Sequence, residues 1–545
     1  MSRREAWLSA GIVFLVAVAV RAWAASLIVF PRPEDAAYYV GVARHIVEGR
    51  GLVTDAIWSF QTPPLTFPRP AFEVWLPLPA FLTAIPMLAL GTSFAAGQVA
   101  SILVGGLVAV LAWRLAADVA AERRLSAGRT RALALGAGLT TAAYLPLVLA
   151  SVEPDSTIVF AALALGACLV MTGIAGGGPA ATTWLVGLGV LLGLAALTRN
   201  EAIWLALAWA IVAWGLAGRS GHAAEPGRRA TWLRLVGIPA VVALAVFAPW
   251  AIRDWLTFGT PLPGQAISNA LSLKGTDIFA WSDPPTLARY LEAGPATLLG
   301  LRLIGFVHNA VDVLLLLGMP VSAIGLVALP WTAMGRTLRP LLLFGVVTFV
   351  ATTLLFPVAT TWGTFLHAAG AIEVLLIITA LVALDGLIER LRAGRGWTRP
   401  VAWLGPALTI PAALLFSVAL LPAEGAAAHA TEARYAAIPA ALEAAGVPLG
   451  AQDGPVITDF PVWFAETTGH TAIALPNEDA ASVVALAATF GSTLLVVQED
   501  NGGLWPEAIG AGGAGSECLH NVPIPHLLAT ADPLKGVLVY SVGCP

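Results

Sequence analysis

The sequence predicts an all-α polytopic membrane protein that carries a small α/β domain at its C-terminal end. Of its 545 residues, 58% are hydrophobic and only 11% are charged, and the mean hydropathy is +0.81. Apolar segments recur along the chain up to residue 421, and most approach the roughly 20 residues that a helix needs to cross a bilayer. A soluble protein has far more charged surface, so this composition excludes a soluble fold.

About eleven segments are predicted to span the membrane. The first, 7–28, follows Arg3 and Arg4 and is too long for the apolar part of a cleaved signal peptide, so we expect it to remain as a helix. The other ten are 94–117, 132–150, 156–174, 182–198, 202–217, 234–251, 303–331, 340–357, 366–385 and 401–421.

Basic residues gather in the loops that lie on the same side as Arg3. These loops contain, among others, Arg123, Arg124, Arg228, Arg229, Arg336, Arg339, Arg390 and Arg392. Short cytoplasmic loops are enriched in Lys and Arg, so we expect a cytoplasmic N-terminus in a multi-pass protein of the cell membrane. The loop 29–93 and the C-terminal tail then lie outside the cytoplasm.

The first outer loop, 29–93, concentrates charge in an otherwise apolar chain. Apolar and aromatic residues at helical spacing follow Asp35 and stop at Gly49 and Gly51, which predicts a short helix that ends in the usual glycine signal. The segment 72–91 is apolar, but prolines interrupt it and a span there would invert the charge pattern. It is therefore predicted to be a juxtamembrane helix.

The tail, 422–545, has a different composition from the membrane part, 1–421. It carries 13 acidic and two basic residues, with β-rich runs at 455–458, 493–498 and 536–542 between alanine-rich helical stretches. This pattern predicts an extracytoplasmic α/β domain, and its acidity excludes a nucleic-acid surface. Outside the cytoplasm, Cys518 and Cys544 either form a disulfide, worth about 3 kcal/mol, or remain two free thiols.

Two carboxylates stand at the ends of apolar segments on separate outer loops. Asp35 begins the short helix of the first loop, and Asp155 precedes the span 156–174. One carboxylate can deprotonate an acceptor hydroxyl while a second orients it or holds a metal. The alternative is that both cap helices, a common role of Asp at a helix N-terminus.

Three basic residues are candidate ligands of a donor phosphate. Arg69, between Pro68 and Pro70, can clamp a lipid phosphate with two contacts, or can bind bulk anionic headgroups. His367 stands at the outer mouth of a span and can contact phosphate or sugar. Arg253, beside Asp254, is either a donor contact or an interfacial anchor among tryptophans.

Two polar pairs complete the candidate residues. His308 and Asp312 are four residues apart and share a helix face, so they can bind a divalent metal or simply bond to each other. Arg199 and Glu201 are expected to form an ion pair that holds helices together. The chain has no Walker-type phosphate-binding loop, so a transferred group would not come from a cytoplasmic nucleotide.

Taken together, these segments resemble the glycosyltransferase-C (GT-C) superfamily, in its bacterial branch related to protein O-mannosyltransferases and lipid A aminoarabinose transferase. The resemblance covers about the first 260 residues in order. It rests on the first span and on five motifs: E-D-A-A-Y-Y-V-G-V-A-R-H-I-V-E-G-R-G, P-R-P, S-V-E-P-D-S, A-L-T-R-N-E-A and P-W-A-I-R-D-W-L-T-F-G-T-P.

The resemblance implies a GT-C fold, a sugar donor on a polyprenyl phosphate and inversion at the anomeric carbon. It makes Asp35 the catalytic base, Asp155 the second acid, and Arg69 the counterpart of a basic residue in the family. Relatives usually read D-E where this chain reads E-D, so Glu34 is a partner or rival of Asp35.

The same resemblance adds Glu153 and Tyr39 as candidate assisting residues. Pro68 stands where some relatives have an acidic metal ligand, which leaves metal dependence open.

We therefore expect an integral membrane glycosyltransferase that acts on the outer face of the membrane. Its partners would be membrane lipids, a polyprenyl-phosphate sugar, and a lipid, glycan or protein acceptor. A transporter or flippase of lipid-linked saccharides is the alternative. It predicts ionisable residues near the bilayer midplane and an inverted repeat, whereas here the charges gather at the outer ends of the spans. A third interpretation is a binding protein that has the same fold and no catalytic activity.

Overall fold

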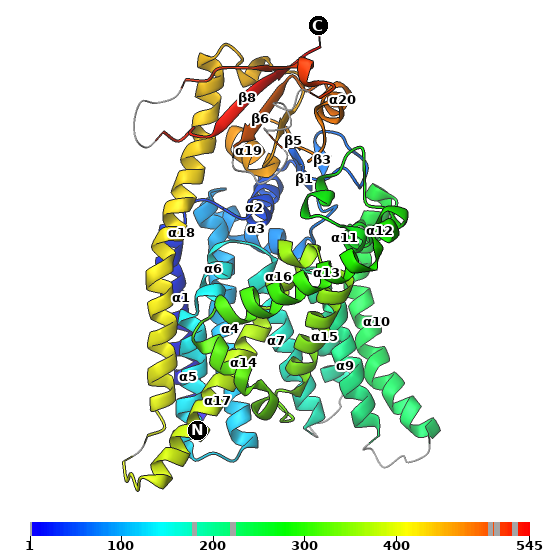
Figure 1. The fold of residues 1–545 in the computed structure, drawn as a ribbon. Coiled ribbons are helices and arrows are strands. Elements are labelled where there is room, and N and C mark those ends of the chain that lie inside the picture. The colour runs from blue at the N-terminus through cyan, green and yellow to red at the C-terminus, as the bar shows by residue number, and fades with distance from the viewer. Residues whose placement is uncertain are drawn as a thin grey trace.

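A computed structural model describes residues 3–176, 182–218, 225–399, 401–499, 505, 513–525 and 532–544. Helices form a bundle, and an α/β unit stands on one end of it (Figure 1). The N-terminus lies at the opposite end of the bundle, and the C-terminus lies at the top of the α/β unit. The long helix α18 (Leu404–Ala444) runs from the bundle up along the α/β unit.

In the described part of the chain, seven helices are long and apolar enough to cross a membrane, or eight if the pair α5 and α6, bent by 54°, is one span. The seven are α1 (Arg3–Leu27), α4 (Phe94–Glu122), α7 (Ser156–Ala175), α10 (Glu225–Phe258), α13 (Gly294–Val307) continued by η2 (His308–Leu316), α17 (Gly370–Gly394) and α18. The bent pair is α5 (Ala127–Ala143) and α6 (Leu145–Val152), and the shorter apolar helices are α8 (Thr182–Ala196), α9 (Ala202–Ala217), α14 (Val321–Thr332) and α15 (Arg339–Leu355). The protein is thus a polytopic membrane protein.

Each predicted span overlaps a helix, but the extents differ at several places, including the bent pair that replaces the segment 132–150. The segment 303–331 is broken between η2 and α14, where Pro320 lacks the N–H that a continuous helix needs. Helix α18 continues past residue 421 to Ala444, so the predicted boundary between the membrane part and the tail falls inside one helix.

The predicted juxtamembrane helices are α2 (Glu34–Val47) and α3 (Leu78–Leu90). Beyond α2, Gly49 has φ of +78°, a left-handed conformation that glycine adopts without strain. The outer segments between the later spans form α11 (Ala266–Leu271), η1 (Gly275–Phe279), α12 (Leu287–Glu292), η3 (Ala359–Trp362) and α16 (Thr364–Ala368).

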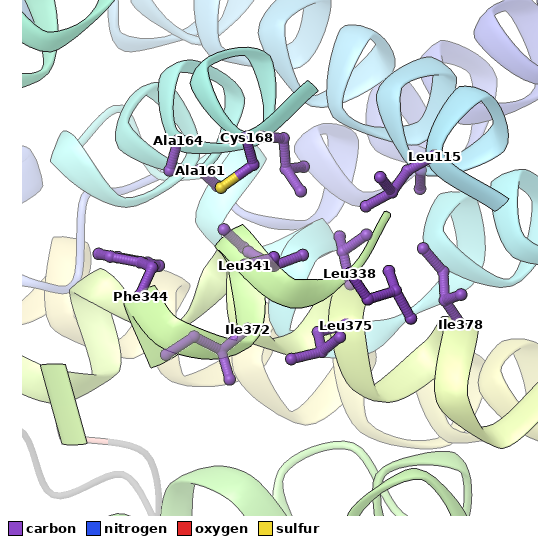
Figure 2. Packing of buried hydrophobic residues seen from close by; sticks show 14 of the residues in the cluster. Leu115, Ala161, Ala164, Cys168, Leu338, Leu341, Phe344, Ile372, Leu375 and Ile378 are labelled. Atoms are coloured by element: carbon purple, nitrogen blue, oxygen red, sulfur yellow. The ribbon is translucent and has the colours of Figure 1, made fainter. Parts of the chain in front are cut away.

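Buried apolar side chains of α4, α7, α15 and α17 form the core of the bundle. Leu115, Cys168, Phe344 and Leu375 are among the residues that converge there (Figure 2). Lipid is as apolar as leucine, so membrane helices associate through close packing rather than through the hydrophobic effect. Small residues permit this approach: a Cβ on Gly370 would lie 2.9 Å from that of Ala161 on α7.

The α/β unit contains a six-stranded sheet with the order β2-β5-β4-β6-β8-β7. Five strands come from the tail: β4 (Val456–Thr458), β5 (Ala472–Ala474), β6 (Leu494–Gln498), β7 (Leu519–Asn521) and β8 (Val537–Val542), together with α19 (Pro461–Thr468), α20 (Ala480–Phe490) and the short turns η4 (Leu449–Ala451) and η5 (Ser516–Cys518). The sixth strand, β2 (Ala56–Ile57), comes from the first outer loop and pairs in parallel with β5. In the same loop, β1 (Val53–Thr54) pairs with β3 (Arg69–Pro70), so the loop and the tail fold as one unit.

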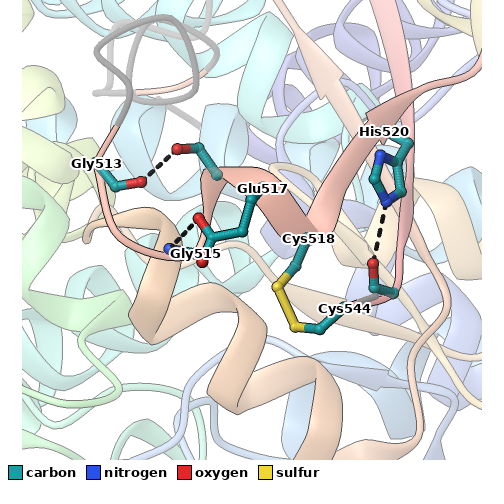
Figure 3. Close-up of a disulfide and its surroundings, with 8 residues drawn as sticks. Gly513, Gly515, Glu517, Cys518, His520 and Cys544 are labelled. Atoms are coloured by element: carbon teal, nitrogen blue, oxygen red, sulfur yellow. Dashed lines mark hydrogen bonds between the residues drawn. A yellow bond between two sulfur atoms is a disulfide. The ribbon is translucent and has the colours of Figure 1, made fainter.

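A disulfide joins Cys518 and Cys544, with an S–S distance of 2.06 Å (Figure 3). The two cysteines flank the antiparallel pair β7 and β8, in which Leu519 lies opposite Val542. The pairing of these strands therefore brings the sulfurs together at the end of the sheet. The third cysteine, Cys168, is free and buried in the bundle.

Candidate active site

A cavity of about 990 Å³ lies among α2, α8, α9, α10 and the outer segments that connect the spans. One side of its wall is polar and aromatic and comes from α2, the turn 58–62, the segment 262–278 and the region around α16. The other side is apolar and comes from α8, α9 and α10. All lining residues precede residue 368, so no described residue of the tail forms part of the cavity wall.

The cavity wall contains a cluster of two carboxylates and one imidazole. Nε2 of His367 lies 3.5 Å from Oδ2 of Asp35, and Nδ1 of His367 lies 3.3 Å from Oδ2 of Asp155. Asp35 and His367 line the cavity, whereas Asp155 lies behind the histidine and is only 5% exposed. The structure thus brings together three of the residues that the sequence analysis singled out.

Local structure explains how the two carboxylates are held. Asp155 is the N-cap of α7: its Oδ1 accepts from the backbone N–H of Thr157 at 2.7 Å, as the capping alternative predicts. Asp35 stands in the first turn of α2 but makes no capping bond, since the N-cap position is Pro33. The Asp35 side chain is therefore available to the cavity, whereas Asp155 is occupied by its own helix.

The hydrogen bonds of Thr157 determine how His367 is oriented. The Thr157 hydroxyl donates to Oδ2 of Asp155 at 3.0 Å, so it accepts from Nδ1 of His367 at 2.7 Å. Burial lowers the pKa of His367, but the bond and charge of Asp155 outweigh burial, and the pKa is raised from its usual value. A protonated His367 then places positive charge between the two carboxylates.

A second polar group borders the same cavity, around Tyr39 and Arg199. Tyr39 lies one turn after Asp35 on α2, and burial raises the pKa of its phenol. Arg199 forms the expected ion pair with Glu201, with contacts of 3.0 and 2.9 Å. Arg199 also donates to the hydroxyl of Ser156 at 2.7 Å. Tyr39, Arg199 and Glu201 line the cavity, which fixes a guanidinium close to Asp35.

Glu34 points away from Asp35 toward the tail. Its carboxylate accepts from Nε1 of Trp58 at 2.9 Å and from the backbone N–H of Val462 in α19 at 3.1 Å. Burial raises its pKa from 4.5 to about 8, although both bonds act in the opposite direction. Glu34 therefore ties the helix of Asp35 to the α/β unit and is not a second base in the cavity.

We expect Glu34→Gln to flatten the pH dependence of stability. The pKa of Glu34 is higher in the folded protein than in the unfolded chain, so the folded state binds a proton that the unfolded state releases. Stability from this group is complete below about pH 4.5 and is lost as the pH rises toward 8. The melting temperature of the detergent-purified protein between pH 4.5 and 9 should fall less steeply in the variant.

A matched control for this measurement is Glu443→Gln, a change of an exposed residue at the end of α18. It should leave the slope of the wild type unchanged. Equal slopes in wild type and Glu34→Gln would contradict the assignment of a raised pKa to Glu34.

Glu153 and Arg69 do not reach the cavity. Burial raises the pKa of Glu153 to about 8, and the charge of Asp155 adds to this shift. The Arg69 side chain is fully buried beside Glu73, and it donates to the carbonyl oxygens of Ser59 and Thr62 at 2.8 and 3.0 Å. The phosphate clamp expected at Arg69 is thus corrected: the guanidinium braces the turn 59–62 and has no exposed face for a ligand.

Arg253 also lies outside the cavity lining. It pairs with Asp254 at 2.9 Å, and its guanidinium stacks on Trp250 and Phe258 at 4.9 and 5.1 Å from the ring centroids. This arrangement matches the anchoring alternative, and the guanidinium does not line the cavity.

His308 and Asp312 contact each other at 3.1 Å, from Nδ1 to Oδ2, on one face of η2. Neither residue lines the cavity. Within the described residues, no group of three or more His, Cys, Asp or Glu side chains is placed to hold a metal ion. This pair therefore offers two ligand atoms at most, fewer than a protein metal site usually supplies.

Lys274 is a cavity residue that sequence reasoning missed. The chain has only two lysines, and Lys274 lines the cavity. Asp277 holds its turn, because Oδ2 accepts from the backbone N–H of Leu273 at 2.7 Å and of Lys274 at 3.0 Å. The scarcity of lysine was the only signal in the sequence, since no motif surrounds this residue.

No protein-family model matches the chain, and no curated protein matches its sequence. Solved structures do match. ArnT from Cupriavidus metallidurans in the apo state has a TM-score of 0.54 at 15% identity, over 99% of this chain and 98% of that chain. The same protein bound to undecaprenyl phosphate has a TM-score of 0.55 at 13% identity, over the same shares.

An oligosaccharyltransferase from Archaeoglobus fulgidus in the apo form is less similar, with a TM-score of 0.48 at 13% identity over 97% of this chain and 75% of that chain. The similarity to ArnT extends over nearly the full length of both chains and includes the bundle as well as the α/β unit. The chain has the fold of the GT-C glycosyltransferases.

Proposed function

We propose that the protein is an integral membrane glycosyltransferase that transfers a sugar from a polyprenyl phosphate to an acceptor hydroxyl on the outer face of the membrane. The observation that carries the proposal is a single cavity with two chemically different sides. Asp35, His367 and Lys274 line the polar side, and apolar residues of three helices line the other. A donor with a charged headgroup, a sugar and a long apolar tail needs both sides.

The apolar side suits a prenyl chain. Leu192 on α8, Trp209 on α9 and Phe247 on α10 are among its lining residues. A prenyl tail reaches the cavity from the bilayer, which is as apolar as leucine, so this wall holds the tail by close packing rather than by the hydrophobic effect, while the headgroup stays at the polar side. The likeness to ArnT, which has been solved with undecaprenyl phosphate bound, supports this placement of the lipid.

The polar side supplies the groups that the transfer requires. The carboxylate of Asp35 takes the proton of the acceptor hydroxyl, whose oxygen forms a bond to the anomeric carbon from the face opposite the phosphate. The bond from that carbon to the phosphate oxygen breaks, and the polyprenyl phosphate leaves with the electron pair. Attack from the opposite face inverts the anomeric configuration.

Positive groups stabilise the leaving phosphate. Lys274 and Arg199 line the cavity, and a protonated His367 adds a third positive charge beside Asp35. Charged donors to phosphate oxygens are roughly twice as strong as neutral ones. We assign the donor phosphate to this set rather than to Arg69 or Arg253.

The proposed orientation places the N-terminus in the cytoplasm and the α/β unit outside. The loops rich in arginine lie at the end of the bundle where the N-terminus is found, and α2, which carries Asp35, lies toward the other end (Figure 1). In this arrangement the membrane part, 1–421, holds the donor, while the tail, 422–545, and the first outer loop together shape access of the acceptor.

Transfer by the purified protein tests the proposal. The detergent-solubilised protein is offered a panel of radiolabelled polyprenyl-phosphate sugars together with native membrane extract as acceptor. We expect label to leave one carrier only when protein and extract are both present, and the product to have the opposite anomeric configuration. Donor binding without turnover of any donor would favour the flippase or the binding protein instead.

A further inference from the structure

Two glutamines in the polar wall of the cavity have unpaired carbonyl oxygens. Gln61 and Gln265 both line the cavity. The Oε1 atom of each is buried and accepts no hydrogen bond within the described residues, and the Gln265 side chain belongs to a residue that is only 6% exposed. A buried acceptor without a partner costs about 1–3 kcal/mol. Such a cost is typical of a site that completes its bonds with a ligand.

For Gln61 the hydrogen-bond network settles which atom of the amide is the oxygen. Nε2 of Gln61 donates to the backbone carbonyls of Asp277 and Ile278 at 3.2 and 3.5 Å. A reversed amide would set its oxygen against two carbonyl oxygens, so the observed orientation is the favourable one.

For Gln265 the structure places Nε2 as the donor to the hydroxyl of Ser59. The hydroxyl of Ser59 donates to the carbonyl of Ile278 at 3.1 Å. The oxygen of the Ser59 hydroxyl therefore accepts from Nε2 of Gln265. The amide nitrogen of each glutamine thus donates within the protein, and each Oε1 atom remains as an acceptor.

The wall that carries these glutamines is held from behind. Arg69 bonds to the carbonyls of Ser59 and Thr62, on either side of Gln61. The hydroxyl of Thr62 donates to the carbonyl of Pro263, near Gln265. The two segments are therefore fixed to each other before a ligand binds, which lowers the entropic cost of binding.

A wall of aromatic rings borders the same cavity. Trp58, Trp75 and Trp362 line it. The ring centroids of Trp58 and Trp75 are 4.8 Å apart, and Phe279 links Trp58 to Trp362 with centroid distances of 5.0 and 5.5 Å. Flat apolar rings beside hydrogen-bond acceptors match a pyranose or furanose, which has C–H faces and hydroxyl edges.

We propose that Gln61 and Gln265 form a saccharide subsite, in which each oxygen accepts a hydrogen bond from a ring hydroxyl of a neutral sugar. The inference rests on the proposed function and deepens it, because it names the groups that select the sugar. Acceptors that are buried and otherwise unpaired discriminate strongly against an analogue that lacks the hydroxyl. The sugar is either the one on the donor or one at the end of a saccharide acceptor, since both present the same hydroxyl chemistry.

The test combines binding and kinetics of the full-length protein in detergent. Methyl glycosides of neutral hexoses and pentoses, with their monodeoxy analogues, are titrated by saturation-transfer NMR against wild type, Gln61→Leu, Gln265→Leu and the control Gln452→Leu. Gln452 lies in the tail, outside the cavity lining. We expect at least a tenfold loss of affinity in both cavity variants, none in the control, and at least a tenfold loss in wild type for one monodeoxy analogue.

Transfer kinetics separate the two sources of the sugar. A raised KM for the donor assigns the subsite to the donor sugar, and a raised KM for the acceptor assigns it to the acceptor saccharide. Melting temperatures show whether each variant is folded. Gln61→Asn, which keeps the amide but shortens the side chain, serves as a second variant. Unchanged binding and unchanged KM in folded cavity variants would overturn the subsite while transfer by wild type stands. Glutamine-dependent binding without transfer by wild type would preserve the subsite and refute the transferase.

Discussion

Asp35→Asn is expected to abolish sugar transfer, with a loss of about 10³-fold in kcat, a typical contribution of a general base. The asparagine keeps the shape of the side chain and its place near His367, where the carboxylate oxygen is 3.5 Å from Nε2, but it cannot take a proton. Donor binding should persist, because Asp35 is not among the groups assigned to the phosphate. The measurement is release of labelled sugar under single-turnover conditions, beside equilibrium binding of the donor.

The control for this variant is Asp453→Asn, which makes the same change at an exposed position of the tail. It should transfer sugar at the rate of the wild type. If Asp35→Asn retained full turnover while its melting temperature matched that of the wild type, Asp35 would not be the base. The carboxylate of Glu201, which also lines the cavity, would then be the next candidate.

Lys274→Gln is expected to lower kcat/KM for the donor by about 10²-fold. Lys274 lines the polar side of the cavity, and loss of one charged donor to a developing phosphate anion costs about 3 kcal/mol in sites of this kind. The effect should be largest in the bond-breaking step, because negative charge grows on the leaving oxygen there. Transfer rates at several donor concentrations separate the change in kcat from the change in KM.

The chain supplies its own matched control, since Lys535 is its other lysine. Lys535 is exposed in the tail just before β8, so Lys535→Gln changes the net charge equally without touching the cavity. The assignment predicts a loss only in the cavity variant. Equal losses in both variants would mean that overall charge attracts the donor and that Lys274 has no specific contact with the phosphate.

Several features of this protein were determined by the sequence alone. The membrane spans and the helix after Asp35 depend on local properties, namely the length of an apolar run and the spacing of residues along one face. The identity of Asp35 and Asp155 as candidate acids came from their positions at the ends of apolar segments. These are properties of a few neighbouring residues, so they can be recognised in the sequence without the structure.

Tertiary structure decided which of the candidate residues share a site. Asp35, Asp155 and His367 meet because the first turns of α2 and α7 lie beside α16, and no local pattern encodes that convergence. Strand β2 has only two residues, too few to show a period, yet it completes the sheet of the tail.

The positions of Arg69 and Lys274 also could not be predicted from the sequence. An arginine between prolines looks identical in a sequence whether its guanidinium faces a ligand or two backbone carbonyls, and a lone lysine in a loop carries no sign of the cavity beside it. The direction of a side chain is set by packing partners that are distant in the chain. For that reason the sequence could predict a kind of chemistry, and only the folded protein placed the charges around the cavity.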